Sequence, residues 1–249
     1  MKEETITLDR DLRKIPIFAV GPDSNEKLPA IIIIHEIFGV NDYIKDVANR
    51  FANVGMRAYA PDLFAPSPLY PKEPAKRDDL DTMRELWMSI PDSQLLSDLQ
   101  GVFGLIAGRP DVLPHSIGTI GFCMGGAISL MFACSEPRLA CVIDYYGRIK
   151  YGALTSNKPK HPIDFTANLK CPLLGLFAGK DELIPFAHRD ELAAQLTKNK
   201  KSFQMKVYDD AQHAFFNDRR QNYDANASAD AWRLTLDFLK AHTAVLQAD

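Results

Sequence analysis

The chain has 249 residues, of which 46% are hydrophobic and 24% charged, and its formal net charge is −3. This composition is typical of a globular protein with one large core. This slightly negative charge argues against a nucleic-acid-binding protein, which needs a basic surface. No apolar run reaches the ~20 residues that cross a bilayer. The charged N-terminus does not resemble a signal peptide. The four cysteines fit neither zinc nor disulfide spacings, so we expect a cytoplasmic protein with reduced thiols.

No internal repeat or low-complexity linker divides the chain, so we expect a single domain over residues 1–249. Alternation and apolar runs predict strands at 5–8, 15–20, 30–35, 56–60, 116–121, 139–145, 172–178 and 203–208. Apolar spacing predicts helices within 42–54, 78–88, 93–107, 124–134, 185–198 and 227–241. Asn41 and Ser93 are the expected N-caps of two of these helices.

Two connecting segments lack a regular pattern. The prolines between residues 61 and 74 exclude a long helix, and this stretch is expected to run over the surface and to shape an acyl pocket. The polar segment 148–169, which includes Lys158, is expected to be a solvated loop. From residue 30 onward, strands and helices alternate, which predicts an α/β fold with a mostly parallel sheet and helices on both faces. Reactive side chains are then expected just after the strands.

The strongest motif follows the strand at 116–121. Gly121-Phe122-Cys123-Met124-Gly125 lies between a strand and a helix, which is the cysteine form of a nucleophile elbow. Glycines beside the nucleophile allow the tight turn, and the helix N-terminus favours a thiolate at Cys123. The alternative is a small buried cysteine at a glycine-rich helix start. A dinucleotide loop fits less well because the glycine spacing differs.

An acid and a histidine follow two later strands. Asp181 can orient a histidine, although an aspartate before a helix can also be only a cap; Glu182 is a weaker candidate. His213 follows the last strand and can reach across the sheet edge. The remaining histidines are less well placed: His35, His115, His161, His188 and His242. The order Cys123, Asp181, His213 is that of α/β hydrolases.

The segment His35-Glu36-Ile37-Phe38-Gly39 follows the first strand of the parallel core. We assign the backbone N–H groups of Ile37 and Met124 to an oxyanion hole. A carboxylate beside that hole is unusual, and we hypothesise that Glu36 keeps the resting thiol protonated and accepts its proton when substrate arrives. The alternative for Glu36 is a structural acid bonded to nearby backbone.

These motifs resemble the dienelactone hydrolase family, also called carboxymethylenebutenolidases. The segments that carry the resemblance are HEIFG at 35–39, GFCMGG at 121–126, DYYG at 144–147, AGKDELIP at 178–185 and QHAFFN at 212–217. The resemblance implies an α/β-hydrolase fold, a Cys123–His213–Asp181 triad assisted by Glu36, and hydrolysis of an enol-lactone or activated ester without a metal or organic cofactor.

Substrate binding departs from the family pattern. Family members hold a substrate carboxylate with arginines, one of them four positions after the catalytic histidine, where this chain has Asn217. The nearby arginines are Arg219 and Arg220, and those in the expected lid segment are Arg77 and Arg84. The alternative for all four arginines is that they are solvated surface charges with no role in substrate binding. Our candidate substrate-binding residues, from the lid segment and the strand-end motifs, are Arg84, Trp87, Tyr146, Phe38, Phe215 and Arg219.

The expected reaction is nucleophilic acyl transfer through a thioester on Cys123. Because a thiolate leaves more readily than an ordinary alkoxide, an enol leaving group is needed to drive acylation forward. The expected partner is a small-molecule ester or lactone, and the expected assembly is a monomer or small homo-oligomer. The alternatives are a redox or stress-response protein in which Cys123 is oxidised, and a binding module that retains a hydrolase pocket.

Overall fold

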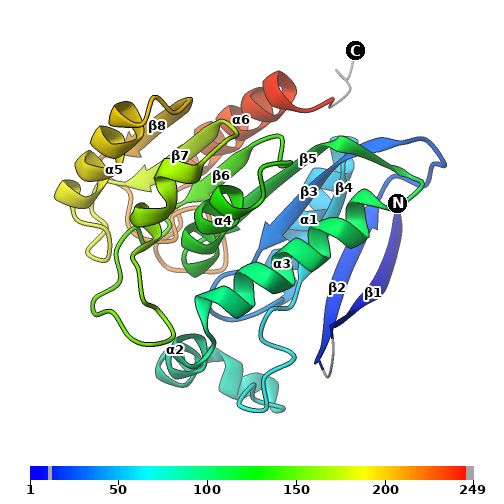
Figure 1. The fold of residues 1–249 in the computed structure, drawn as a ribbon, viewed down its shortest axis with the longest axis horizontal. Helices are drawn as coiled ribbons and strands as arrows, with labels where there is room; N and C mark the ends of the chain where they lie inside the picture. The colour runs from blue at the N-terminus through cyan, green and yellow to red at the C-terminus, as the bar shows by residue number, and fades with distance from the viewer. Residues whose placement is uncertain (11–12, 245–249) are drawn as a thin grey trace.

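An eight-stranded sheet forms the centre of the computed structural model, which describes residues 1–10 and 13–244 (Figure 1). Its strand order is β1-β2-β4-β3-β5-β6-β7-β8. The strands are β1 (Lys2–Arg10), β2 (Arg13–Gly21), β3 (Leu28–Ile34), β4 (Arg57–Pro61), β5 (Val112–Phe122), β6 (Val142–Tyr145), β7 (Leu173–Ala178) and β8 (Phe203–Tyr208). β3 to β8 run parallel to one another, whereas β2 pairs antiparallel with both of its neighbours, β1 and β4. The predicted mostly parallel sheet is confirmed.

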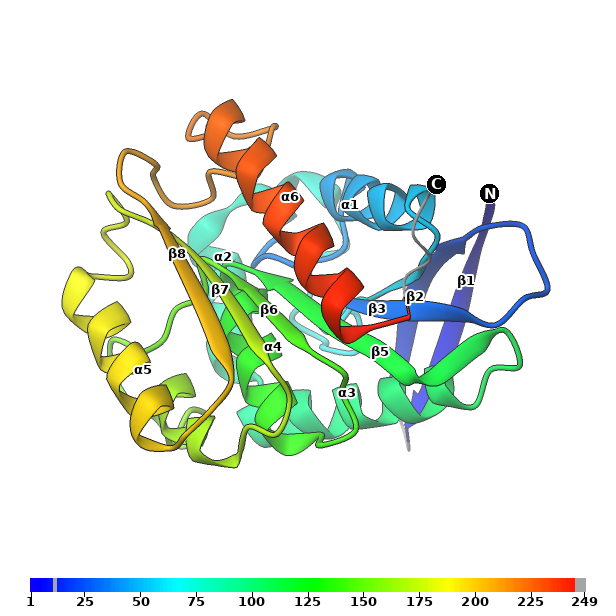
Figure 2. The same ribbon diagram turned by 90° about the horizontal axis from the view of Figure 1, so that it is seen from above.

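Helices cover both faces of this sheet. They are α1 (Asp42–Asn53), α2 (Leu80–Ser89), α3 (Asp92–Ala107), α4 (Met124–Ser135), α5 (Phe186–Lys198) and α6 (Ala225–His242), with 3-10 turns η1 (Pro74–Asp78) and η2 (Pro162–Asn168). Figure 2 shows α1 and α6 on one face and α3, α4 and α5 on the other. α2 lies apart from these layers, below the sheet in Figure 1.

The burial of β3 follows from this arrangement. All seven of its residues are buried, and Ile31 to Ile34 are fully inaccessible. A central parallel strand with helices on both faces has no solvent side, so its sequence is a continuous apolar run. Each such isoleucine contributes about 1.5–3 kcal/mol to folding relative to an exposed side chain. The edge strand β1 instead alternates between exposed and half-buried residues.

Two local predictions about helix starts have different outcomes. Asn41 caps α1, since its side chain accepts a hydrogen bond from the Ile44 N–H at 3.1 Å. Ser93 is not a cap, because α3 begins one residue earlier, at Asp92. Pro91 occupies the cap position and its carbonyl accepts bonds from the N–H groups of Gln94 and Leu95. The fixed φ of proline suits a helix start.

The two connecting segments also differ from the predictions. The stretch after β4 is partly internal, with Leu63 2% and Phe64 0% exposed. The segment 148–169 is not a solvated loop, because Lys158 is 0% exposed and η2 packs against the fold. Both errors arise from polar or proline-rich sequence that is buried by tertiary contacts distant in the chain.

The parallel arrangement brings the ends of β3, β5, β7 and β8 to one edge of the sheet. The residues that follow these strands are those singled out by the sequence. None of the helices in the described ranges combines the length and apolarity needed to cross a membrane.

Candidate active site

Cys123 occupies a sharp turn between β5 and α4. Its backbone has φ 55° and ψ −117°, a conformation that non-glycine residues rarely adopt. The turn needs glycines, because a Cβ on Gly121 would lie 1.9 Å from the Gly125 carbonyl oxygen and one on Gly125 would lie 2.2 Å from that of Ile34. The Cys123 N–H donates to the Tyr145 carbonyl at 3.0 Å. The thiol is therefore held at the start of α4, where unpaired amides and the helix dipole favour negative charge.

His213 lies between Cys123 and Asp181. Its Nε2 is 3.0 Å from the Cys123 Sγ, and its Nδ1 is 2.7 Å from Asp181 Oδ2. The other oxygen of Asp181 accepts from the Leu183 N–H at 2.9 Å. The Asp181 side chain is fully inaccessible and that of His213 is 19% exposed. The structure thus brings together three side chains from three strand ends, at hydrogen-bond distances.

Electrostatics favour a charged His213. Burial opposes protonation of the imidazole, but the neighbouring Cys123 and the hydrogen bond to Asp181 outweigh it and raise the pKa of His213 to about 11. The largest favourable contribution to this raised pKa is the Coulombic interaction with Cys123.

Glu36 is buried at the same edge and is 3% exposed. Its Oε2 accepts from Asn217 Nδ2 at 2.8 Å, whereas Oε1 is buried without a hydrogen-bond partner among the described residues. Burial raises the pKa of Glu36, and the Asn217 bond and the charges of Arg220 and His213 lower it by less. Asn217 is thus an uncharged partner for this carboxyl.

His35 holds the loop that carries Glu36. The Leu63 N–H donates to its Nε2 at 3.2 Å, so that nitrogen is unprotonated and Nδ1–H donates to the Glu36 carbonyl at 2.6 Å. Burial lowers the pKa of His35, which fits this neutral tautomer. His35 therefore links the segments that follow β3 and β4.

A pocket of about 520 Å³ opens onto Cys123 and His213. Its wall includes Glu36, the oxyanion-hole candidates Ile37 and Met124, and four of the predicted substrate-binding residues: Phe38, Arg84, Trp87 and Arg219. α2 supplies one side of this wall through Leu80, Arg84 and Trp87. Residues 61–74, which were expected to shape the acyl pocket, do not line this pocket.

Tyr146 and Phe215 do not reach the pocket. Both are 0% exposed and lie beneath the site, where the Tyr146 ring packs edge-on against His213 at 5.3 Å and against Phe215 at 5.3 Å. The prediction that these two residues bind substrate is therefore wrong, because they pack under the site and support it from the core. The cause is that aromatic side chains in a motif can face either the site or the core, and the motif does not distinguish these orientations.

Two arginines outside that prediction line the pocket. Arg220 stacks on the Phe38 ring, with its guanidinium carbon 4.2 Å from the ring centroid. Arg148 comes from the polar segment after β6, and its Nε donates to the Lys150 carbonyl. The signal for Arg220 was its place in the loop after His213, whereas nothing in the sequence marked Arg148. Four arginines and one buried carboxyl thus line the pocket, which favours anionic ligands.

No group of three or more potential metal ligands gathers in the portion of the chain that the structure describes.

The mostly parallel eight-stranded sheet, with a strand–turn–helix elbow at its edge, defines an α/β hydrolase fold. A solved α/β hydrolase from a deep-sea metagenome, MGS-M1, shares this fold with a TM-score of 0.71 at 14% identity, over 97% of each chain.

Closer relatives identify the family. Residues 15–243 match the dienelactone hydrolase family. The chain is 32% identical to the Methylorubrum extorquens protein named "Putative carboxymethylenebutenolidase", over 92% of this chain and 77% of that one. It is 34% identical to the Escherichia coli K12 protein of the same name, over 92% and 83%. A Klebsiella pneumoniae crystal structure titled "Putative Dienelactone Hydrolase" matches with a TM-score of 0.88 at 30% identity, over 96% and 98%. The chain belongs to the dienelactone hydrolase family and is a hydrolase of that type.

Proposed function

We propose that the protein hydrolyses enol-lactones or activated carboxylic esters through a thioester on Cys123. The observation that carries this proposal is His213, which lies 3.0 Å from the Cys123 sulfur and 2.7 Å from the Asp181 carboxyl. A nucleophile, a base and a group that orients the base are the elements that covalent acyl transfer requires.

In the acylation step, the Cys123 sulfur attacks the ester carbonyl and the C–O bond to the leaving group breaks. The imidazolium of His213 gives its Nε2 proton to the departing oxygen. The developing oxyanion is stabilised by the N–H groups of Ile37 and Met124, which line the pocket beside Cys123. Met124 is the first residue of α4, where helical geometry leaves amides without internal partners.

Deacylation uses the same histidine as a base. Once the sulfur is acylated it carries no charge, so the largest contribution that raises the pKa of His213 disappears. Burial then favours the neutral imidazole, which takes a proton from water as the water attacks the thioester. Asp181 holds Nδ1–H throughout, which keeps Nε2 directed at the reaction centre.

We further propose that Glu36 controls the protonation state of the Cys123 thiol. Its raised pKa and its unpartnered Oε1 fit a carboxyl that exchanges a proton, while the Asn217 amide holds Oε2. In this proposal Glu36 keeps Cys123 protonated until a substrate occupies the pocket. The thiol proton then passes to the carboxylate.

The wall of the pocket supports an anionic substrate. Arg84, Arg148, Arg219 and Arg220 line it together with a single buried carboxyl, Glu36. A carboxylate on an ester or lactone would reduce the repulsion among these guanidinium groups. The names of the relatives, which refer to dienelactone and carboxymethylenebutenolide, agree with such a substrate. The leaving-group argument from the sequence separately favours enol esters over simple alkyl esters.

The test is hydrolysis of p-nitrophenyl acetate, followed by a panel of lactones with and without a carboxylate. Cys123→Ala should abolish turnover and His213→Ala should strongly reduce it. Cys134→Ala is the matched control, because burial raises the pKa of that thiol to about 12 and leaves it unreactive. Full esterase activity in Cys123→Ala would overturn the proposal.

A redox function for Cys123 is the competing class. Asp181 is not needed for oxidation of a thiol, whereas it is needed to orient a catalytic histidine. Peroxide consumption that survives in Asp181→Asn, combined with no ester turnover in the parent protein, would favour the redox alternative.

A further inference from the structure

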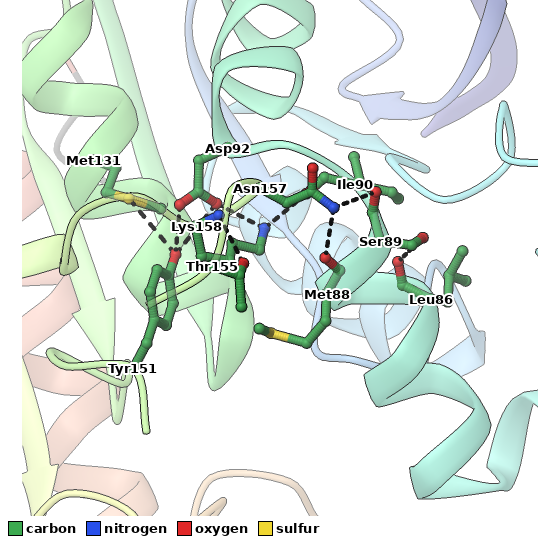
Figure 3. Close-up of polar contacts among 10 residues, drawn as sticks. All are labelled: Leu86, Met88, Ser89, Ile90, Asp92, Met131, Tyr151, Thr155, Asn157 and Lys158. Atoms are coloured by element: carbon green, nitrogen blue, oxygen red, sulfur yellow. Dashed lines mark hydrogen bonds and ion pairs between the residues drawn. The ribbon is translucent and has the colours of Figure 1, made fainter. Parts of the chain in front are cut away.

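A buried lysine connects the segment after β6 to α2. Lys158 is 0% exposed, and its Nζ donates to Asp92 Oδ1 at 2.7 Å and to the Ile90 carbonyl at 2.9 Å (Figure 3). The same ammonium lies 5.4 Å from the centroid of the Trp87 ring. Lys158 therefore contacts the residue that follows α2, the first residue of α3 and Trp87, an aromatic residue of α2 in the pocket wall.

The neighbouring Asn157 contacts the same end of α2. Its Nδ2 donates to the carbonyls of Met88 and Ser89 at 3.1 and 3.0 Å, and its own carbonyl accepts from the Asp92 N–H at 2.9 Å. The last carbonyls of a helix have no partner within the helix. Here side chains 68 and 69 residues away in the sequence donate to these carbonyls, and Lys158 adds a positive charge at the negative end of the helix dipole.

Asp92 is the centre of this cluster. Besides Lys158, both of its carboxyl oxygens lie at 3.1–3.2 Å from the Tyr151 hydroxyl, which donates to them. The Tyr151 ring packs edge-on against Trp87 at 5.7 Å. Trp87 is thus held on two sides by groups that converge on one buried carboxyl. We call Asn157, Lys158, Asp92 and Tyr151 the α2 clamp.

The position of α2 determines one wall of the pocket. Leu80, Arg84 and Trp87 all come from this helix. α2 lies outside the layers that pack on the sheet (Figure 1), so its placement depends on contacts at its ends more than that of α3 or α4. A buried ion pair is a poor source of stability, but it fixes geometry well when every polar group has a partner.

We propose that Lys158 and Asp92 are positioning residues that hold Trp87 and Arg84 at the pocket and thereby determine which substrates bind. This inference rests on the proposed function in one respect, which is that the ester substrate binds in this pocket. Neither residue touches the reacting groups, which come from the ends of β3, β5, β7 and β8. Loss of the clamp should therefore weaken binding of substrate and transition state equally, which raises KM and leaves kcat unchanged.

The test combines kinetics with the fluorescence of Trp87. The chain contains two tryptophans, so Trp232→Phe leaves Trp87 as the only one. In that background, Lys158→Met should shift the emission to longer wavelength and increase quenching by acrylamide. For a carboxylate-bearing ester, KM should rise on the order of tenfold while kcat stays within about twofold. Lys150→Met is the matched control. Lys150 lies on the same segment as Lys158, but its ion pair is with Glu191 of α5, so its replacement does not change a contact with α2.

A second variant separates positioning from folding. If Lys158→Met leaves Asp92 as a buried unpaired charge and does not fold, Lys158→Met/Asp92→Leu removes both charges and should fold. The double variant should keep the raised KM and the altered Trp87 emission even where its thermal stability equals that of the parent. Rescue by Lys158→Arg, measured as partial recovery of KM, would support a role of the charge.

The inference is overturned if a folded variant lacking Lys158 has the KM and Trp87 emission of the parent. It is also overturned if kcat falls in proportion to lost stability with KM unchanged, because that pattern indicates only a structural role. If the parent protein hydrolyses no ester, the proposed function fails, whereas the fluorescence of the same variants still shows whether Lys158 fixes the position of Trp87.

Discussion

Replacing Asp181 with asparagine tests the orientation of His213 without changing the size of the side chain. In the parent protein, Asp181 Oδ1 accepts from the Leu183 N–H at 2.9 Å and Oδ2 accepts from His213 Nδ1–H at 2.7 Å. An asparagine has only one oxygen. If that oxygen stays with Leu183, the amide NH₂ faces His213 and forces Nδ1 to become an acceptor.

The proton then resides on Nε2, which faces the Cys123 sulfur at 3.0 Å. In that tautomer Nε2 cannot take a proton from water during deacylation, and the carboxylate that helps raise the pKa of His213 to about 11 is gone. The opposite amide orientation restores the tautomer but places NH₂ against the Leu183 N–H, so a hydrogen bond worth about 0.5–1.5 kcal/mol is lost. The wrong tautomer therefore predominates.

We expect kcat for p-nitrophenyl acetate to fall by about 10³–10⁴, equivalent to about 4–5.5 kcal/mol of transition-state stabilisation. Residual turnover should increase further into the alkaline range than in the parent, because hydroxide must then attack the thioester in place of water activated by His213. Asp210→Asn is the matched control, an exposed acid of the loop after β8 that pairs with Lys180 at 2.8 Å. Asp181→Asn with activity within about threefold of the parent would refute this reasoning.

Three further predictions concern the carboxyls and glycines around the site. Glu36→Gln should shift iodoacetamide labelling of Cys123 to lower pH, and an unchanged labelling profile would contradict the proposed proton exchange. Burial raises the pKa of Asp144 from 3.8 to about 7, so the folded state retains a proton that the unfolded state loses. The free energy of unfolding therefore declines by up to about 4 kcal/mol as the pH rises from about 4 to about 7. Asp144→Asn should remove this decline in chemical denaturation at about pH 5 and about pH 8, and the reasoning is wrong if the two proteins show the same pH dependence. Gly125→Ala, whose Cβ would lie 2.2 and 2.5 Å from backbone oxygens, should destabilise by about 1–3 kcal/mol or more. Gly104→Ala, with open space around its Cβ, should stabilise by up to about 1 kcal/mol; equal melting temperatures for these two variants would show that the elbow is not tightly packed.

The sheet and the order of the candidate catalytic residues could be predicted from local sequence. The continuous apolar run of β3 fits a strand buried on both faces and does not fit a solvent-exposed element. The spacing of glycines around Cys123 fits few structures other than a tight strand–helix turn. Because the ends of parallel strands meet at one edge, the placement of Asp181 and His213 after their strands was enough to bring them near Cys123.

The surroundings of these residues could not be predicted in the same way. The partner of Glu36 is Asn217, 181 residues away, and burial of Lys158 depends on Asp92, 66 residues away. A lysine in a polar segment is normally solvated, and only the tertiary fold brings a carboxylate to it. The same reason explains why Tyr146 was expected in the pocket, whereas it packs beneath His213.

The central claim is that Cys123 carries the acyl group during turnover. The most direct measurement is rapid acid quenching during hydrolysis of p-nitrophenyl acetate, followed by mass spectrometry of the digested protein. The account predicts the added mass of one acetyl group on the peptide that contains Cys123, present during turnover and absent once substrate is exhausted. Acetylation at a different residue in step with turnover, or sustained hydrolysis with Cys123 never modified, would contradict it.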